Sequence, residues 1–376
     1  MIIAIEGQRI FRKKKHGMDF VALETIREIQ KIDKNNQYYV IVAPGEDMCL
    51  EETENFKIIE INSFGGYFGW EQIALAKEIK KIKPDILHCT SNTAPLFGSS
   101  KLIITLHDII FLEKLTSKNK SIYQKLGRIY RRFVVPRIIP KAKKIITVSE
   151  FERDRIKDFL KLDSNKIISI YNGYSKHFQI KNNPKEVFRK YINTDNYLFF
   201  LGNTDPKKNT ERTILAYADY ISRAENGKIY SLLIADLKEE YVDTILERNN
   251  IQHIKQYLVC PDYIPNVDLP YIYSGARAFL YTSLRESFGI PILESMACGC
   301  PIITSNTSAI PEIAGKGAIL INPLNIEEIS TMIERLIGDE NFRAKQINYG
   351  LERVKLFSWA NTARELINVY HQVFND

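Results

Sequence analysis

Residues 171–186 read "YNGYSKHFQIKNNPKE" and interrupt an otherwise regular alternation of short apolar runs and longer helical patterns. Before this stretch, runs rich in β-branched residues alternate with helical patterns, and after it the same alternation starts again. Asn, Gly and Pro cluster in the stretch, and such clusters separate periodic segments. The sequence therefore predicts two similar α/β domains in series, with a boundary near 172–196.

The apolar runs predict the strands of both domains. In the first half they are 2–5, 38–42, 57–61, 85–89, 101–106, 144–148 and 167–171. In the second half they are 197–202, 229–235, a short run near 253–258, 277–282, 301–304 and 318–322. Strands that alternate with helices favour βαβ units and parallel sheets. We expect two Rossmann-like, doubly wound domains, 1–180 and 181–358, which face each other across a cleft, and a last helix from about 359 to 376 that crosses back onto the first domain.

Length, composition and cysteine content indicate an ordinary globular protein of the cytoplasm. The chain of 376 residues exceeds the size at which one hydrophobic core stops growing, which favours two domains. Its five cysteines are scattered, with no CxxC pair to suggest zinc or thiol exchange, and this fits a reducing compartment. The opening "MIIAIEGQRI" is too short an apolar run for a signal peptide, and the sequence contains no apolar stretch of membrane-spanning length.

Positive charge is concentrated in the first half of the chain. Residues 1–180 hold 31 Lys and Arg against 21 Asp and Glu, whereas residues 181–376 hold 21 against 24. Residues 114–144 carry eleven bases and no acid, interleaved with Ile, Tyr, Phe and Val. Such a segment is either a solvated helix face or a contact with an anionic membrane surface. We expect no nucleic-acid partner.

The second domain opens with a candidate phosphate site. Residues 200–212 read "FLGNTDPKKNTER", which predicts a strand, a turn and a helix that begins near Asn209. Lys207 and Lys208 then precede the unpaired amides of a helix N-terminus, where anions bind. The alternative is a plain turn with solvated lysines.

Two carboxylates in "RESFGIPILESMACGC", residues 285–300, form the second candidate site. Glu286 is predicted in a loop, and Glu294 in the first turn of a helix that begins near Pro291. A carboxylate accepts two hydroxyl hydrogen bonds at once, which suits a sugar diol. Backbone amides at the same helix start, from Phe288, Gly289 and Ile290, suit a phosphate. The alternative is that the acids only complement the helix dipole.

Other chemistries find less support. Two acids on one loop and one helix are poorly placed to flank a glycosidic bond, as a glycosidase requires. The sequence has no His/Cys/Asp cluster with metal spacing, so we predict no metal site. The first strand is not followed by GxGxxG, which disfavours a nicotinamide dinucleotide.

Two polar residues of the first domain have structural alternatives. In "IITLHDIIF", His107 ends a buried strand, where it either contacts a sugar hydroxyl or caps the strand. In "TVSEFERD", Ser149 is predicted to cap a helix.

The sequence resembles the retaining glycosyltransferases of sequence family 4, the group 1 glycosyltransferases. "ESFGIPILE" is similar to the Glu-x7-Glu motif of that family, and the residues that follow it also match. The blocks "LHDIIF", "ITVSEFERDRI", "LGNTDPKKN" and "FSWANTARELINVY" occur in the family's order and extend over most of the chain. The resemblance implies a GT-B fold, with the nucleotide-sugar donor held by the second domain and the acceptor by the first.

The resemblance also implies roles for the two glutamates. Glu294 would hold the ribose hydroxyls of the donor, and Glu286 the hydroxyls of its sugar. The amides around Phe288, Gly289 and Ile290 would meet the sugar and the diphosphate.

Four further residues gain roles from the resemblance. Lys208 would stabilise the leaving diphosphate, and Asn203 stands where many members have a diphosphate-binding arginine. His107 would contact the donor sugar from the first domain. Gly17 matches the glycine of a first-domain loop that contacts diphosphate and acceptor.

These features together predict a metal-independent retaining hexosyltransferase without a cofactor. Its donor would be a nucleoside-diphosphate sugar, with GDP-mannose favoured, and its acceptor a hydroxyl of a glycan or a lipid-linked glycan in cell-surface polysaccharide synthesis. The alternatives are another GT-B sugar-nucleotide enzyme, such as an epimerase, and a nucleotide-sugar or glycan-binding protein without turnover. A cytoplasmic protein, peripheral on the inner face of the plasma membrane, is the expected location.

Overall fold

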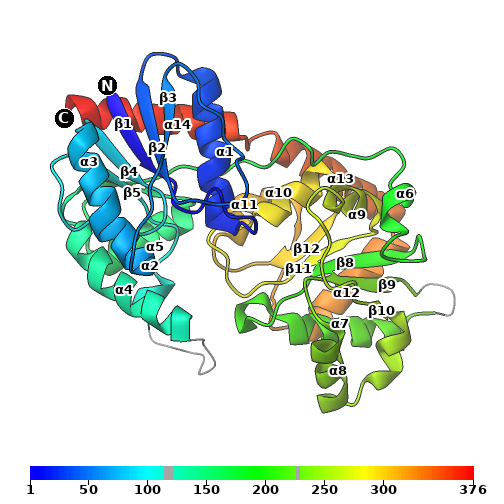
Figure 1. The fold of residues 1–376 in the computed structure, drawn as a ribbon. Helices are drawn as coiled ribbons and strands as arrows, with labels where there is room; N and C mark the ends of the chain where they lie inside the picture. Colours follow the sequence, from blue (N-terminus) through cyan, green and yellow to red (C-terminus); the bar gives the residue numbers. More distant parts are fainter. Residues whose placement is uncertain (114–121, 226–228) are drawn as a thin grey trace. The chain divides into compact units, whose positions relative to one another are not determined.

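The computed structural model describes residues 1–113, 122–225 and 229–376, and only the backbone of 122–124 (Figure 1). The first part of the basic segment 114–144 therefore lies outside the described residues. The chain forms two compact units. Unit 1 comprises Met1–Gly173 and Ser358–Asp376, and unit 2 comprises Tyr174–Phe357.

Unit 1 contains a seven-stranded sheet in the order β3-β2-β1-β4-β5-β6-β7. Its strands are β1 Ile2–Glu6, β2 Gln37–Val42, β3 Phe56–Glu60, β4 Ile86–Cys89, β5 Lys101–Thr105, β6 Ala142–Thr147 and β7 Ile167–Ser169. All neighbouring strands are parallel. The strand order reverses between β1 and β4, which is the point where open parallel sheets bind ligands beyond their carboxyl ends.

Helices cover both faces of this sheet, and its strands are accordingly mainly apolar, with most of their polar residues at the strand ends. The helices are α1 Gly17–Ile32, α2 Gly66–Gly69, α3 Ala76–Ile82, α4 Ile122–Ile138, α5 Glu150–Leu160 and α14 Trp359–Asn375. Residues of α1 and α14 share one hydrophobic core with the sheet, and residues of α3, α4 and α5 share the other. Trp70–Leu75 form a wider π-helical turn that leads into α3.

The last helix, α14, is an integral part of unit 1 (Figure 1). The Ser358 side chain caps it by accepting a hydrogen bond of 3.1 Å from the Asn361 amide. The buried side chains of Leu366, Val369 and Tyr370 pack into the core that α1 also covers. The two ends of the chain therefore stabilise the same sheet.

Unit 2 contains a six-stranded parallel sheet in the order β10-β9-β8-β11-β12-β13. Its strands are β8 Tyr197–Leu201, β9 Ser231–Ala235, β10 Leu258–Val259, β11 Phe279–Tyr281, β12 Ile302–Ser305 and β13 Ile319–Ile321. The strand order reverses between β8 and β11. The sequence places its candidate donor residues directly after these two strands.

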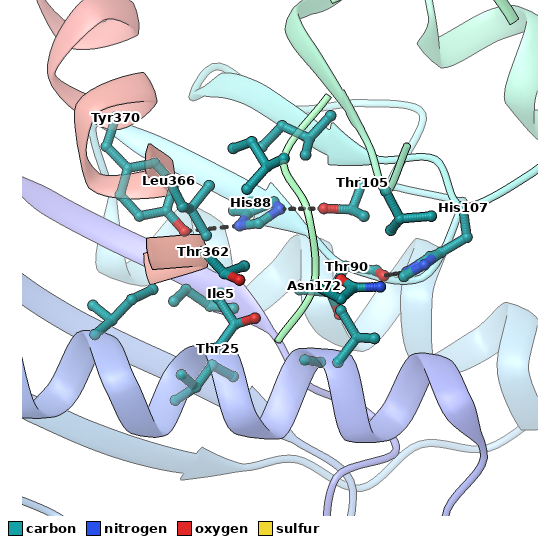
Figure 2. Close-up of a pocket in the computed structure, with 17 residues that line it drawn as sticks. Ile5, Thr25, His88, Thr90, Thr105, His107, Asn172, Thr362, Leu366 and Tyr370 are labelled. Atoms are coloured by element: carbon teal, nitrogen blue, oxygen red, sulfur yellow. Dashed lines mark hydrogen bonds between the residues drawn. The ribbon is translucent and has the colours of Figure 1, made fainter. Parts of the chain in front are cut away.

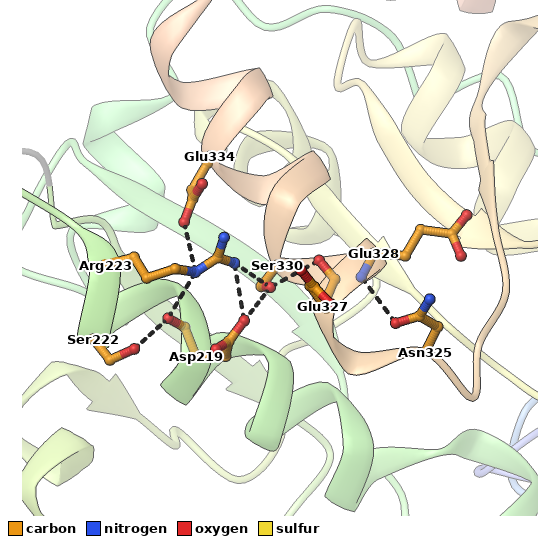
Figure 3. Close-up of polar contacts among 8 residues, drawn as sticks. All are labelled: Asp219, Ser222, Arg223, Asn325, Glu327, Glu328, Ser330 and Glu334. Carbon is orange, nitrogen blue, oxygen red and sulfur yellow. Dashed lines mark hydrogen bonds and ion pairs between the residues drawn. The ribbon is translucent and has the colours of Figure 1, made fainter.

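The helices of unit 2 are α6 Lys185–Phe188, α7 Thr210–Arg223, α8 Glu239–Arg248, α9 Leu269–Gly275, α10 Ile290–Ala297, α11 Ile310–Ala314, α12 Ile326–Gly338 and α13 Glu340–Val354. Polar contacts join α7 to α12 (Figure 3). The Arg223 guanidinium donates to Asp219 at 2.9 Å and pairs with Glu334 at 3.2 Å. Ser330 Oγ donates to the same Asp219 carboxylate at 2.5 Å. This network holds the helix that follows the candidate phosphate turn.

The prediction of a strand near 253–258 is wrong for most of its length. Gln252–Tyr257 form a 3₁₀ helix, and only Leu258 and Val259 pair with β9. The apolar residues Ile254 and Tyr257 recur at a spacing of three, which places them on one side of a 3₁₀ helix rather than on one face of a strand.

The described part of the basic segment forms α4 and the start of β6. The inward side chains of α4, including Val134, Val135 and Ile138, are buried in the core of unit 1. Among the described residues, no helix combines the length and the apolar composition needed to cross a bilayer.

Candidate functional site

The loops after β8 and β11 meet at the carboxyl edge of the second sheet. The Leu284 amide donates a hydrogen bond of 2.7 Å to the carbonyl of Lys207. The Asp205 carboxylate accepts from the Lys207 amide at 3.1 Å and shapes the turn before α7. These bonds place the candidate phosphate turn beside the loop that carries Glu286.

Lys208 and Glu286 form an ion pair, with 2.5 Å between Lys208 Nζ and Glu286 Oε1. Both side chains are largely buried, with 24% of Lys208 and 13% of Glu286 exposed. The sequence predicts that one contacts a diphosphate and the other a sugar, and the structure brings the two together. A phosphate that bound here would compete with Glu286 for the ammonium group.

Tyr281, at the end of β11, is a site residue that the sequence analysis missed. The Lys208 ammonium lies over its ring, 5.4 Å from the centroid. Burial, followed by the charge of Glu286 and a hydrogen bond to it, raises the pKa of the Tyr281 hydroxyl well above its usual value. The position was visible in the sequence as the next-to-last residue of the predicted strand 277–282, whose carboxyl end faces the predicted site.

The Glu286 backbone is anchored to the loop after β12. Its amide donates to Ser308 Oγ at 3.0 Å, and Thr307 Oγ1 donates to the Leu284 carbonyl at the same distance. Ser308 was also missed, because a serine so far along the chain carries no local signal. The loops after three neighbouring strands, β8, β11 and β12, therefore fix the backbone of Glu286.

Gly289 caps α10 with a backbone conformation that favours glycine. Its φ and ψ are 101° and 56°. Phe288, just before it, is buried with its ring 6.1 Å from that of Phe357, so its side chain packs inside unit 2. Ile290 is the first helical residue, and its amide belongs to the unpaired first turn.

Gly289→Ala should lower the free energy of unfolding by about 1–2 kcal/mol, because a Cβ in the left-handed region is strained. The added methyl would also come within 3.0 Å of Ile292 Cδ1. Gly338→Ala is the matched control, since a Cβ there meets nothing within 4 Å and φ is negative or extended. Urea unfolding of both variants checks the prediction, and equal stabilities would contradict it.

Glu294 lies in the second turn of α10, so its predicted place in the first turn is wrong. The helix begins at Ile290, one residue before the predicted Pro291. As a whole residue Glu294 is partly buried, and no hydrogen bond or ion pair joins its carboxylate to another described residue. Burial of the carboxyl group raises its pKa to about 8. This carboxyl is therefore a partly buried group that lacks a hydrogen-bond or ion-pair partner within the described chain.

Asn203 is exposed in the loop after β8. Its Oδ1 accepts a hydrogen bond of 2.9 Å from the Asp205 amide, and its carbonyl accepts from Thr210 Oγ1 at 2.6 Å. Both bonds shape the turn that carries Lys208. Asn203 therefore builds the turn, and its contact with a diphosphate stays a prediction.

Gly17 lies in unit 1, at the equivalent edge of the first sheet. It is the exposed first residue of the 16-residue helix α1, which follows the loop after β1. A Cβ at this position would meet nothing within 4 Å, and the Asp19 carboxylate in the first turn accepts a hydrogen bond of 2.9 Å from the His16 amide. The contact of Gly17 with diphosphate and acceptor stays a prediction.

His107 lies two residues after β5 and lines a cavity of about 40 Å³ in unit 1 (Figure 2). Its Nε2 lies 3.0 Å from the carbonyl of Thr90, and a carbonyl only accepts, so Nε2 carries the proton. Burial lowers the pKa of His107, which keeps the ring neutral. Nδ1 is therefore an acceptor, and a sugar hydroxyl would have to donate to it.

The same cavity contains His88, which links α14 to the sheet (Figure 2). Its Nδ1 lies 2.8 Å from the Tyr370 hydroxyl, and its Nε2 lies 2.8 Å from Thr105 Oγ1. Burial lowers the pKa of His88 to about 3, so the ring is neutral at physiological pH. We interpret His88 as a structural residue.

Tyr370→Phe should lower the free energy of unfolding by about 1–3 kcal/mol, because it leaves a buried imidazole nitrogen without that partner. Tyr349→Phe is the control, since Tyr349 is 39% exposed on α13. Thermal unfolding of both variants checks the prediction. A Tyr370→Phe protein as stable as the Tyr349→Phe protein would contradict it.

Within the described ranges, no group of three or more His, Cys, Asp or Glu side chains is arranged to hold a metal ion. The absence of a metal requirement stays a prediction. The polar groups of unit 2 that could face a donor are the Lys208 ammonium, the two carboxylates and the amides at the start of α10.

Solved structures resemble the chain over its whole length. Sucrose-phosphate synthase from Thermosynechococcus elongatus has a TM-score of 0.77 at 16% identity, over 100% of this chain and 99% of that chain. WaaG, a glycosyltransferase involved in lipopolysaccharide biosynthesis, has a TM-score of 0.72 at 12% identity, over 98% and 99%. At such identities the likeness shows the fold alone. The two parallel-sheet units define the GT-B class, as predicted.

Family models match both units. Residues 16–177 match the model described as Glycosyltransferase Family 4, and residues 182–353 match Glycosyl transferases group 1. The chain belongs to the family 4, group 1 glycosyltransferases, which confirms the resemblance.

Curated relatives in this family include several mannosyltransferases. O-antigen chain mannosyltransferase B of Escherichia coli is 32% identical over 61% of this chain and 60% of its own length. The serotype-specific mannosyltransferase WbdA of Escherichia coli is 27% identical over 76% of this chain and 36% of its own length. The matches thus span less than two thirds of either relative.

Proposed function

We propose that this chain is a retaining mannosyltransferase that uses GDP-mannose. It would transfer the mannosyl unit to a hydroxyl of a glycan or lipid-linked acceptor in cell-surface polysaccharide synthesis. The observation that carries the proposal is the convergence of Lys208, Glu286 and the start of α10 at the point where the second strand order reverses. The names of the relatives in Escherichia coli favour mannose as the sugar.

In this proposal the residues of unit 2 hold the donor. The Glu294 carboxylate accepts from the ribose hydroxyls, and the Glu286 carboxylate accepts from the sugar hydroxyls. Lys208 and the amides at Gly289 and Ile290 stabilise the charge that develops on the departing diphosphate, which is the largest electrostatic term in such a reaction. Tyr281 positions both Lys208 and Glu286.

The acceptor hydroxyl attacks the sugar on the face from which the diphosphate leaves, so the configuration is retained. An oxygen of the donor phosphate takes the acceptor proton, and no protein group needs to act as general base. Nδ1 of the neutral His107 ring accepts a hydrogen bond from a sugar hydroxyl, and Gly17 contacts the diphosphate or the acceptor. Neither a metal nor a cofactor enters the proposed reaction.

The proposed reaction takes place in the cytoplasm, at the inner face of the plasma membrane. A lipid-linked acceptor presents its glycan at that surface, and the basic segment 114–144 is the proposed point of contact. WaaG, a structure with the same fold, is itself described as involved in lipopolysaccharide biosynthesis.

A thermal-shift screen of UDP-, GDP- and ADP-sugars tests the donor, followed by product analysis with the donor that binds. GDP-mannose should raise the unfolding temperature most, and the mannosylated product should have the anomeric configuration of the donor. Stabilisation by UDP- or ADP-sugars alone would contradict the choice of donor. Conversion of the bound sugar nucleotide into an isomer would instead indicate an epimerase, and binding without any product a binding protein.

A further inference from the structure

The helix α4 is apolar on its outward side as well as on its inward side. Leu126, Ile129 and Phe133 are 61%, 63% and 50% exposed. Their spacing of three and four residues places them in one row along the helix. A surface helix of a globular protein normally carries polar residues on this side. The exposed row therefore needs an explanation other than the core of unit 1.

Bases flank this row. The helix carries five Lys and Arg and no acid, and Lys125, Arg132 and Arg137 are exposed beside the apolar side chains. The Arg137 guanidinium lies over the Phe133 ring, 3.8 Å from its centroid, and donates to the Phe133 carbonyl at 2.7 Å. The Arg132 guanidinium donates to the carbonyl of Leu112 at 3.3 Å.

Four of the five bases of α4 are not paired with a carboxylate among the described residues. Across the part of the chain that the structure describes, Lys125, Arg128, Arg132 and Arg137 form no ion pair with an acidic side chain. Arg128 and Arg132 donate instead to the main-chain carbonyl of Glu113. Their charges therefore remain available to an anionic surface outside the protein.

The neighbouring helix α2 also exposes an aromatic side chain. The ring of Phe68 lies 5.8 Å from that of Tyr130 on α4, and Phe68 is 54% exposed. Phe64, in the loop before α2, is completely exposed. Two neighbouring elements of unit 1 thus present aromatic or aliphatic side chains to solvent.

We propose that the outward face of α4 docks on an anionic lipid bilayer. Leu126, Ile129 and Phe133 enter the boundary between headgroups and acyl chains, and the flanking bases contact the lipid phosphates. Helices with an apolar row bordered by Lys and Arg lie in the plane of such an interface. A row of bases without acids fits a uniformly anionic surface. This inference deepens the proposed function. It rests on that function for one point, namely that the acceptor is bound to a membrane.

Vesicle flotation with the full chain tests this docking. Phosphatidylcholine vesicles are compared with vesicles that also contain phosphatidylglycerol. The wild-type protein should float with the anionic vesicles, and added salt should weaken the binding, since exposed charges are screened. Ile129→Ser/Phe133→Ser should reduce binding by about tenfold or more, because two apolar side chains no longer leave water. Lys125→Gln/Arg132→Gln should reduce it by a similar factor, at about fivefold for each base.

Matched variants on other helices of unit 1 provide the controls. Phe159→Ser removes an aromatic side chain that is 52% exposed on α5. Lys77→Gln/Lys80→Gln removes two exposed lysines of α3. Both should bind anionic vesicles as the wild-type protein does. Unfolding temperatures near that of the wild type verify that the α4 variants remain folded.

Equal flotation with neutral and anionic vesicles, or unchanged binding of both α4 variants, would overturn the docking proposal. Transfer to a water-soluble acceptor is measured in parallel and should be unchanged in the α4 variants. Vesicle binding without transfer would refute the proposed function alone. Transfer without vesicle binding would refute the docking alone.

Discussion

Glu286→Ala is expected to abolish hexosyl transfer, with kcat lowered by at least about 100-fold. The variant loses the carboxylate that accepts sugar hydroxyls and also the partner that holds the Lys208 ammonium at 2.5 Å. Lys208 is partly exposed, so water can solvate it and the fold should survive. Initial rates with saturating donor, together with the unfolding temperature, check both parts of the prediction.

The control for this variant is Glu352→Ala, which breaks an ion pair on α13. The Glu352 side chain is 73% exposed and pairs with Lys355 at 2.6 Å. Because this pair lies on the solvent side of the helix, transfer should remain at the wild-type rate. Full activity of the Glu286→Ala protein would show that Glu286 has no part in the reaction.

Glu294→Gln is expected to change the pH dependence of donor binding more than the rate of transfer. The carboxyl has a pKa of about 8, so it is mostly protonated at neutral pH. Ribose hydroxyls that donate to it favour the ionised form. Donor affinity should therefore rise with pH by up to about tenfold per unit and level off above the pKa. Glutamine cannot ionise, so the variant should bind more weakly and with a flat profile.

Stability should show the opposite pH dependence. The unfolded chain releases this proton near the ordinary pKa of a glutamate, whereas the folded protein retains it up to about pH 8. The folded state thus binds more protons between these values, and this carboxyl makes the free energy of unfolding fall as pH rises through the window. Glu294→Gln should remove that contribution.

Calorimetric titration with the donor in buffers of different ionisation enthalpy measures both affinity and proton release. The wild-type protein should release protons on binding below pH 8, and the Glu294→Gln protein should release fewer. Equal release by the two proteins would show that Glu294 is not the titrating group in the site.

The strand and turn signals of the sequence were sufficient to predict the sheet architecture and the loop positions of Lys208 and Glu286. Both depend on local patterns, because apolar runs make buried parallel strands and Pro206 and Asn209 shape a turn. The prediction of a strand near 253–258 was also wrong for a local reason, because the spacing of its apolar residues is that of a 3₁₀ helix.

What the sequence could not supply are contacts between residues far apart in the chain. Lys208 and Glu286 are separated by 78 positions, and Glu286 and Ser308 by 22. From the sequence alone, Tyr281 cannot be distinguished from an aromatic residue of the core. Only the structure shows that its ring lies beneath the Lys208 ammonium. Glu294 was predicted in the first turn of α10 but lies in the second, because the helix begins one residue before its predicted start.

The sequence alone also did not reveal the outward-facing apolar row on α4. Leu126, Ile129 and Phe133 alternate in sequence with residues that pack against the core of unit 1, such as Tyr130 and Val134. Periodicity does not separate two apolar faces of one helix. The charge of the segment was evident from the sequence, but the exposed side chains between the bases were not.

Hydrogen–deuterium exchange of the full chain, with and without GDP-mannose, tests most directly whether the loops after β8 and β11 hold the donor. The account predicts slower exchange at residues 202–209 and 284–294, with a smaller effect in Glu294→Gln at the same donor concentration. Donor binding that leaves both segments unchanged and protects a different part of unit 2 would contradict it.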